Sequence, residues 1–164
     1  METRTAEREA TREILIFVLG KEEYGVDILK VQEIRGYEKV TVIPGAPAYL
    51  KGVVNLRGTI VPVIDLRIRF GMPDPAYDSL TVVIVLRIAG RVVGAVVDAV
   101  SDVVRLAENE IREAPKLGAM VDSSYLSGVA TQGDRMILAL DIEKLLSAAE
   151  MNLLGEAASA APSS

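Results

Sequence analysis

The side chains that carry out most enzyme chemistry are absent from this sequence. Its 164 residues include no cysteine and no histidine. The lack of cysteine excludes disulfides, thiolate nucleophiles, Fe–S clusters and cysteine-ligated zinc, and the lack of histidine removes the commonest general base and most zinc sites. No phosphate-binding glycine loop, Ser-x-x-Lys dyad or nucleophile elbow occurs either. Most familiar hydrolytic chemistry is therefore ruled out.

The charged residues that remain suggest binding. Glu22 and Glu23 fall in an expected hairpin loop, where two solvated carboxylates need no special role. Arg57 is expected at the tip of another hairpin, in the run Asn55–Gly58. An arginine fork serves protein interfaces well, so Arg57 is predicted to bind a partner, with an ordinary solvated arginine as the alternative.

A mixed stretch, Asp27–Tyr37, combines charged residues with regularly spaced aliphatic ones. Read as a strand, it points Val31 and Glu33 the same way, which places an apolar side chain beside a charge. This pattern fits a binding face, and it equally fits a half-buried strand with a polar rim. Val103 and Val104 carry the same ambiguity, and one of them is expected to face outward.

Charge and hydropathy limit the partners and the location. The chain has 18 basic and 23 acidic residues, a net charge of -5, so nucleic-acid binding is disfavoured. Residues 1–13 alternate acids and arginines and resemble neither a secretory signal nor an anchor, and the longest apolar run, Leu80–Leu86, is too short to span a bilayer. We expect a cytoplasmic protein without membrane insertion, monomeric when free.

Short runs rich in valine and isoleucine, separated by glycine, proline and charged residues, predict an all-β fold. One helix is expected near the end of the chain, from the N-cap Asp141 to about Gly155. Asp65 is expected to open a short helical turn through Phe70. Residues 1–13 and 155–164 are expected to be flexible tails.

An internal repeat divides the chain. Gly25–Arg35 aligns with Gly94–Val104 at an offset of 69 residues, which pairs Val31 with Val100, Glu33 with Asp102 and Ile34 with Val103. Leu50–Val54 then aligns with Leu126–Ala130 at an offset of 76, and the same offset pairs Arg57 with Gly133 and Asp65 with Asp141. The predicted domains are residues 14–76 and 77–154, with a possible exchange of terminal strands. Units this small are expected to share an interface.

Three segments, in this order and spacing, resemble the bacterial chemotaxis coupling family CheW. They are Tyr24–Gly36, Leu50–Leu66 and Val96–Val104. The resemblance extends from about Ile14 to Leu154, well beyond a single motif.

The resemblance implies two packed five-stranded SH3-like β-barrels with a C-terminal helix and no catalytic activity, so no cofactor or metal is expected. It further implies an adaptor that couples the cytoplasmic tip of transmembrane methyl-accepting chemoreceptors to the regulatory domain of the histidine kinase CheA, and that is recruited to receptor arrays at the inner face of the membrane. By position, Val31, Glu33, Arg57 and Val103 correspond to the receptor-binding surface. Gly52 corresponds to a kinase-binding position, where a glycine acts through backbone geometry.

Two alternatives stay open in the sequence. One is a CheW-like coupler of a different receptor–kinase pathway, such as surface motility. The other is a double barrel that binds a small ligand or acts as an enzyme, although the sequence offers no set of converging polar groups for such a pocket.

Overall fold

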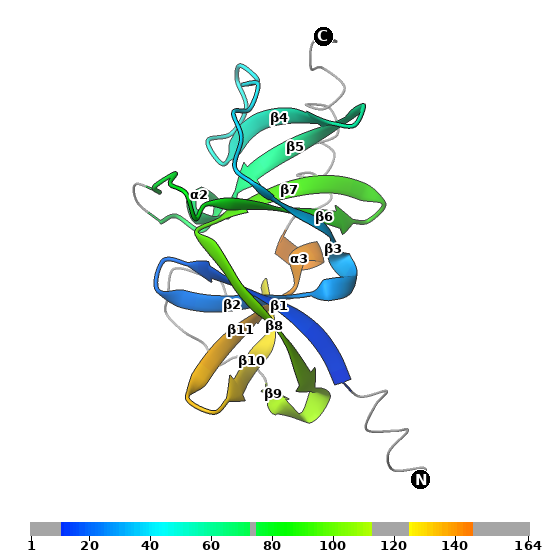
Figure 1. Cartoon of the computed structure of the whole chain (residues 1–164), viewed down its shortest axis with the longest axis vertical. Helices are drawn as coiled ribbons and strands as arrows, with labels where there is room; N and C mark the ends of the chain where they lie inside the picture. The colour runs from blue at the N-terminus through cyan, green and yellow to red at the C-terminus, as the bar shows by residue number, and fades with distance from the viewer. Residues whose placement is uncertain (1–10, 73–74, 113–124, 146–164) are drawn as a thin grey trace.

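The computed structural model describes residues 11–72, 75–112 and 125–145 of the chain. These residues form two β-sheets, one above the other in Figure 1, with short helical segments in the connections between strands. The all-β prediction is confirmed. Valine and isoleucine suit such strands because their branched side chains pack well on a pleated surface.

The lower sheet in Figure 1 has six strands in the order β8-β1-β2-β11-β10-β9. Their bounds are β1 (Thr11–Leu19), β2 (Glu22–Asp27), β8 (Ala99–Ala107), β9 (Ile111–Arg112), β10 (Leu126–Gln132) and β11 (Arg135–Leu140). All neighbours are antiparallel except β2 and β11.

The upper sheet has five strands in the order β3-β6-β7-β5-β4. Their bounds are β3 (Val31–Gly36), β4 (Leu50–Leu56), β5 (Thr59–Asp65), β6 (Val82–Ile88) and β7 (Arg91–Val97). Here β5 and β7 are the parallel pair. The short helical segments are η1 (Ile28–Lys30), α2 (Leu66–Arg69), η2 (Glu108–Glu110) and α3 (Ile142–Leu145).

The sheets exchange one strand each. The β1–β2 hairpin belongs to the lower sheet, but β3 crosses over and pairs with β6 in the upper sheet. The β6–β7 hairpin belongs to the upper sheet, and β8 crosses back to pair with β1. The predicted division between residues 76 and 77 therefore does not coincide with the division between the sheets. Residue patterns indicate strands but do not indicate which strands pair.

The internal repeat appears in matching local geometry. Asp65 caps α2 and its backbone N–H donates to the carbonyl of Tyr49 at 2.8 Å. Seventy-six residues later, Asp141 precedes α3 and donates in the same way to Tyr125, also at 2.8 Å. The expected helical turn after Asp65 is confirmed, with Phe70 as its C-cap.

Three apolar clusters hold the fold together. The largest, called here the shared core, combines residues of both sheets, such as Phe17 of β1 and Ile84 of β6. A second cluster fills the lower sheet around Ile16 and Leu106, and a third fills the upper sheet around Val61 and Val85. The expectation of packed halves rather than separate beads is thus met by a core that neither sheet completes alone.

The ends of the chain differ partly from the expectation. Strand β1 begins at Thr11, so residues 11–13 belong to a strand instead of a tail, because they pair with Arg105–Ala107 of β8. The predicted C-terminal helix is present as α3 over Ile142–Leu145. Its expected continuation to Gly155, like the tails 1–10 and 155–164, lies outside the described residues.

Candidate functional site

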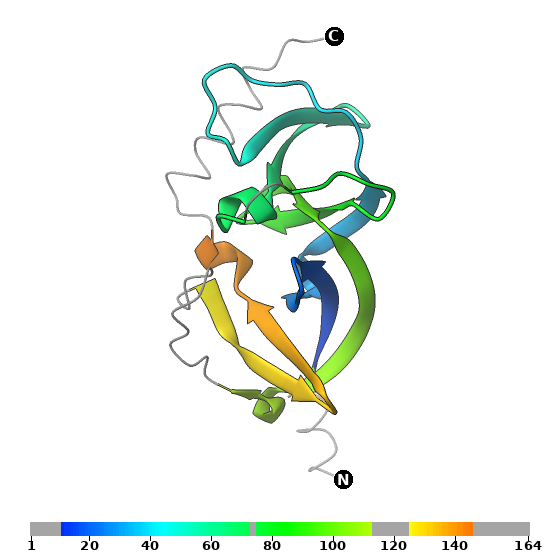
Figure 2. The same cartoon turned by 90° about the vertical axis from the view of Figure 1, so that its left-hand side faces the viewer.

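The exchanged strands β3 and β8 carry three of the four residues predicted to bind a receptor. Val31 begins β3 and is half-buried against the shared core. Val103 lies on β8 and is 48% exposed, whereas Val104 beside it is buried, which answers which of the two faces outward. Both strands lie on the side of the molecule that faces the viewer in Figure 1, at the right-hand edge of Figure 2.

Two further aliphatic side chains complete this face. Ile34 of β3 is 44% exposed, and Val100 of β8 packs partly buried against the shared core. We call Val31, Ile34, Val100 and Val103 the apolar strip. Their ladder partners Leu86, Ile84, Phe17 and Leu15 all belong to the shared core. Because paired residues project on the same face of a sheet, the strip continues that core to the surface.

Arg57 occupies the predicted hairpin tip. Leu56 pairs with Thr59, so Arg57 and Gly58 form a two-residue turn, and the Asn55 side chain accepts from Gly58 N–H at 2.8 Å. Arg57 has φ +52° and Gly58 φ +90°, the combination that a type I′ turn requires. An arginine in this left-handed conformation costs roughly 1 kcal/mol. The turn itself would be better served by glycine.

A chain of charges runs from this turn along β3. Arg57 Nη2 donates to Glu33 Oε2 at 2.9 Å, Arg35 reaches the other oxygen of Glu33 at 3.5 Å, and Arg35 also donates to Glu38 at 3.3 Å. The hydrogen bond from Arg57 holds the pKa of Glu33 below its ordinary value. The structure therefore brings Glu33 and Arg57 together, as a bonded pair at the edge of the upper sheet. The expectation that Val31 and Glu33 point the same way is wrong, because a bulge at Gln32 pairs Val31 with Leu86 of the shared core and Glu33 with Val85 of the upper cluster.

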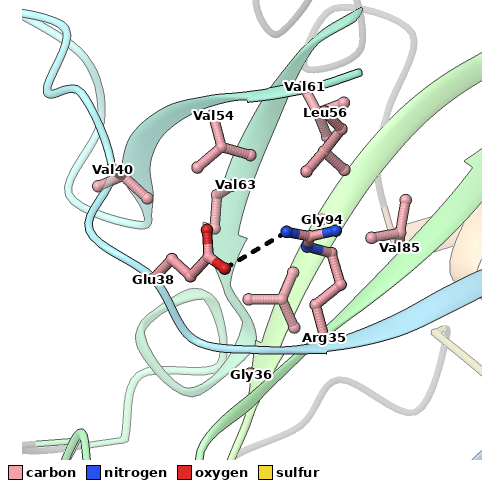
Figure 3. Close-up of a pocket in the computed structure, with 11 residues that line it drawn as sticks. Arg35, Gly36, Glu38, Val40, Val54, Leu56, Val61, Val63, Val85 and Gly94 are labelled. Carbon is pink, nitrogen blue, oxygen red and sulfur yellow. Dashed lines mark hydrogen bonds and ion pairs between the residues drawn. The ribbon is translucent and has the colours of Figure 1, made fainter.

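An apolar pocket opens behind these charges, and Figure 3 displays it with Arg35 and Glu38 paired at its mouth. Its walls come from β3 to β7 and the segment after β3. It is lined by Arg35, Gly36, Glu38, Val40, Val54, Leu56, Val61, Val63, Val83, Val85 and Gly94. We call it the barrel pocket. Valine side chains dominate it, and its cavity volume of about 20 Å³ leaves room for little more than one water molecule. It offers no catalytic arrangement.

Comparisons with known proteins agree with this architecture. A CheW-like domain model matches residues 13–150. The chain is 52% identical over 147 residues to the chemotaxis protein CheW of Klebsiella aerogenes, covering 90% of this chain and 89% of that protein. It is 37% identical to a probable CheW of Rhizobium etli, covering 87% and 92%. The chain belongs to the CheW-like family.

A solved CheW structure extends the similarity to three dimensions. The scaffolding protein TtCheW of Thermoanaerobacter tengcongensis superimposes with a TM-score of 0.77 at 34% identity, covering 85% of this chain and 90% of that one. Members of the CheW family are scaffolds, and this chain is accordingly a non-catalytic chemotaxis coupling adaptor. In the described parts of the chain, no helix is both long and apolar enough to cross a membrane, and no cluster of acidic side chains is suited to a metal ion.

Gly52, which the resemblance predicts to be a kinase-binding position, is buried. Its φ is +149°, and a Cβ there would lie 2.2 Å from the carbonyl oxygen of Thr41. That close approach allows Thr41 and Val53 to exchange two backbone hydrogen bonds of 2.9 Å. Gly52 thus allows the segment between β3 and β4 to lie against the sheet at Thr41.

Sequence reasoning missed a buried ion network beside α2. Arg67 is 1% exposed and binds both oxygens of Asp65 at 2.9–3.0 Å. It also binds Asp98 at 2.8 Å, and the second oxygen of Asp98 accepts from Gly20 N–H at 2.7 Å. Tyr77 lies over the guanidinium at 4.8 Å and donates to Asp65. The network joins the β1–β2 turn, α2 and the crossover into β8.

The same network perturbs the acidity of Asp65. Burial by itself would raise the pKa of Asp65, but the hydrogen bonds from Arg67 and Tyr77 outweigh burial and hold that pKa below its ordinary value. The only signal in the sequence is the run Asp65–Leu66–Arg67, which a helix cap explains equally well. Asp98 lies 31 residues away from Arg67, so its part in the network could not be seen there.

Proposed function

We propose that this CheW-family adaptor joins the cytoplasmic tip of methyl-accepting chemoreceptors to the regulatory domain of the histidine kinase CheA. The observation that carries the proposal is the apolar strip with the Glu33–Arg57 pair at the same strand. A second, separate surface, the segment between β3 and β4 that lies against Gly52, supports simultaneous binding of two partners.

The receptor is proposed to bind at the apolar strip. A receptor tip is a helical hairpin, and an amphipathic helix recognises a row of aliphatic side chains through its own apolar face. Ile34 and Val103 are about half exposed, so the strip gives such a helix apolar surface to bury. Arg57 extends from the adjacent turn with a largely exposed side chain and would contact polar groups at the edge of the helix.

The kinase is proposed to bind at the segment seated by Gly52. This segment includes the exposed Val42 and leads from the barrel pocket, whose wall contains Val40. An apolar side chain of the kinase would pack on the exposed Val42 of this segment. Binding to both partners would recruit the adaptor from the cytoplasm to receptor arrays at the inner face of the membrane.

Calorimetric titration tests the receptor surface. The full chain is titrated with a chemoreceptor hairpin fragment and, separately, with the isolated regulatory domain of CheA. Val103→Asp is expected to weaken receptor binding at least tenfold and to leave kinase binding unchanged, because it places a charge in the apolar strip. The matched control is Leu80→Asp, because Leu80 is also an exposed aliphatic residue but lies in the turn before β6, outside the apolar strip.

Arg57→Ala tests the charged edge of the same surface. The receptor Kd is expected to rise about fivefold, the value of one exposed ionic contact, with thermal stability nearly unchanged. Arg12→Ala is the control, because Arg12 makes a similarly exposed ion pair with Glu108. Equal losses in both variants, or saturable binding of neither partner by the unmodified chain, would contradict the proposal.

A further inference from the structure

The apolar strip consists of two matching halves, one on β3 and one on β8. Val31 and Val100 are separated by 69 residues, as are Ile34 and Val103, and each pair occupies matching positions on β3 and β8. Both strands also carry a bulge at matching positions. The ladder of β3 skips Gln32, and the ladder of β8 skips Ser101, again 69 residues later. A helix lying across the strip would therefore meet the same apolar pattern in either direction.

The neighbouring carboxylates repeat as well. Glu33 on β3 matches Asp102 on β8, and each binds an arginine that comes from, or next to, a hairpin turn. The two hairpins, β4–β5 and β10–β11, lie at opposite ends of the molecule in Figure 1. The apolar side chains and the carboxylates together thus leave the direction of a bound helix unspecified.

The arginines break this symmetry. Arg135 binds Asp102 through two contacts of 3.1 and 2.9 Å and binds Glu23 through two more of 3.1 and 2.8 Å. Its side chain is 32% exposed, and its guanidinium is held by two carboxylates of the chain. Hydrogen bonds from Arg135 lower the pKa of Asp102, as expected for a closed ion pair.

Arg57 is held far less firmly. It makes one hydrogen bond, to Glu33, and its side chain is 65% exposed. If Arg57 turned toward a partner, Glu33 would keep its contact with Arg35. The position that matches Arg57 in the repeat is Gly133, with φ +62°, so the β4–β5 turn presents an arginine where the matching β10–β11 turn presents no side chain.

We propose that Arg57 determines the direction in which an amphipathic helix lies on the apolar strip. The helix carries an acidic residue beyond one end of its apolar face, and that carboxylate pairs with Arg57. The inference rests on the proposed receptor function and adds the polarity of docking to it. An arginine–carboxylate contact at one end only would favour one direction by about fivefold, the value of one exposed ionic contact.

Paramagnetic broadening measures this polarity directly. A nitroxide is attached to a single cysteine at the tip of a chemoreceptor hairpin fragment, and amide signals of the isotope-labelled full chain are recorded. The chain has no cysteine, so the label cannot transfer to it. With the unmodified chain, the label is expected to broaden amides near one turn only, either Arg57–Gly58 or Gly133–Asp134.

Two variants then remove the arginine from the β4–β5 turn or transfer it to the β10–β11 turn. Arg57→Gly installs the residue found at the matching position and is expected to give broadening at both turns. Arg57→Gly combined with Gly133→Arg is expected to transfer the broadening to the opposite turn. The second substitution fits, because a Cβ on Gly133 meets nothing within 4 Å and its φ is close to that of Arg57.

The results distinguish the polarity role of Arg57 from receptor binding itself. One-sided broadening that Arg57→Gly leaves unchanged would overturn the polarity role while retaining the receptor surface. Broadening of both turns by the unmodified chain would overturn it as well. No broadening and no binding by the unmodified chain would overturn the proposed function, and the polarity role with it.

Discussion

Single residues in this chain divide into those that shape the backbone and those that face a partner. Gly52 belongs to the first class, because its conformation and the approach of Thr41 leave no space for a side chain. Arg57 is proposed to belong to the second, because the matching turn of the repeat carries a glycine and so does not require an arginine. The distinction matters for mutagenesis, since loss of coupling at Gly52 and at Arg57 would have different physical causes.

Gly52→Ala is expected to destabilise the protein by about 2–4 kcal/mol, through strain at a special backbone position and loss of the Thr41–Val53 bonds. Urea unfolding measures the change. Gly58→Ala is the control, because it also has a positive φ but nothing lies within 4 Å of its Cβ, and it is expected to cost about 1 kcal/mol. Equal losses would mean that the close approach of Thr41 contributes nothing.

At the scale of elements, α2 is held by an ion network and by burial of Leu66 in the shared core, and not by its own length. It has four residues, too few for a stable isolated helix. The Asp65–Arg67–Asp98 network fixes it to the crossover between β7 and β8 and to the β1–β2 turn. Its counterpart α3 is joined to the other crossover by an exposed ion pair between Glu143 and Lys30.

Breaking the buried network is expected to be costly. Arg67→Met leaves Asp65 buried without its cation and should lower the free energy of unfolding by about 3–5 kcal/mol, whereas Asp65→Asn with Arg67→Met should cost less than the sum of the single changes. The matched control is Lys30→Met, which breaks the exposed Lys30–Glu143 ion pair. It is expected to lower the free energy of unfolding by under about 1 kcal/mol. A double-mutant cycle in urea measures the coupling, and strict additivity would contradict it.

The free energy of unfolding is expected to fall at acid pH as Asp65 becomes protonated. Its pKa is lower in the folded protein than the ordinary value near 3.9 of an unfolded chain. The unfolded state therefore binds the proton first, so this contribution is complete above about pH 4 and is lost as the pH falls through the folded pKa. Urea midpoints from pH 6 to pH 2.5 should decline less steeply in Asp65→Asn than in the unmodified chain.

Asp102→Asn provides the comparison for that measurement. The pKa of Asp102 is also lowered, by Arg135, but this carboxylate is exposed and its contribution is screened by solvent. A smaller change in the acid slope is expected. If Asp102→Asn flattened the slope more than Asp65→Asn, burial of the α2 network would not be the source of the acid sensitivity.

The sequence predicts the strands, the turn at Arg57 and the helical start at Asp65, because these depend on local alternation, positive-φ turns and capping. It does not predict the exchange of β3 and β8, because strand partners depend on contacts distant in the chain. The repeat pairs Ile34 with Val103 and Val31 with Val100, but only the strand ladders and the exposed fractions show that these four residues form one face. The ion network stayed hidden because Asp98 joins Arg67 across 31 residues.

For the whole molecule, strand exchange and the shared core make the two sheets one cooperative unit. Removing the lower sheet would strip Leu15 and Phe17 from the core that also covers Ile84 and Leu86 of the upper sheet. Each sheet also receives its edge strand from a crossover that the other half of the chain anchors. Neither barrel is therefore expected to persist when the other unfolds.

Leu106→Ala tests this cooperativity, because Leu106 is fully buried in the lower cluster alone. It should lower the free energy of unfolding by about 2–5 kcal/mol. Amide exchange under native conditions should then accelerate by the same factor in the most protected amides of β1 and of β5, although β5 makes no ladder with the lower sheet. Val61→Ala in the upper cluster is the reciprocal variant and should accelerate exchange in β1 equally with β5. Acceleration confined to the mutated sheet would mean that the barrels unfold independently, and no strain would then be transmitted from one sheet to the other.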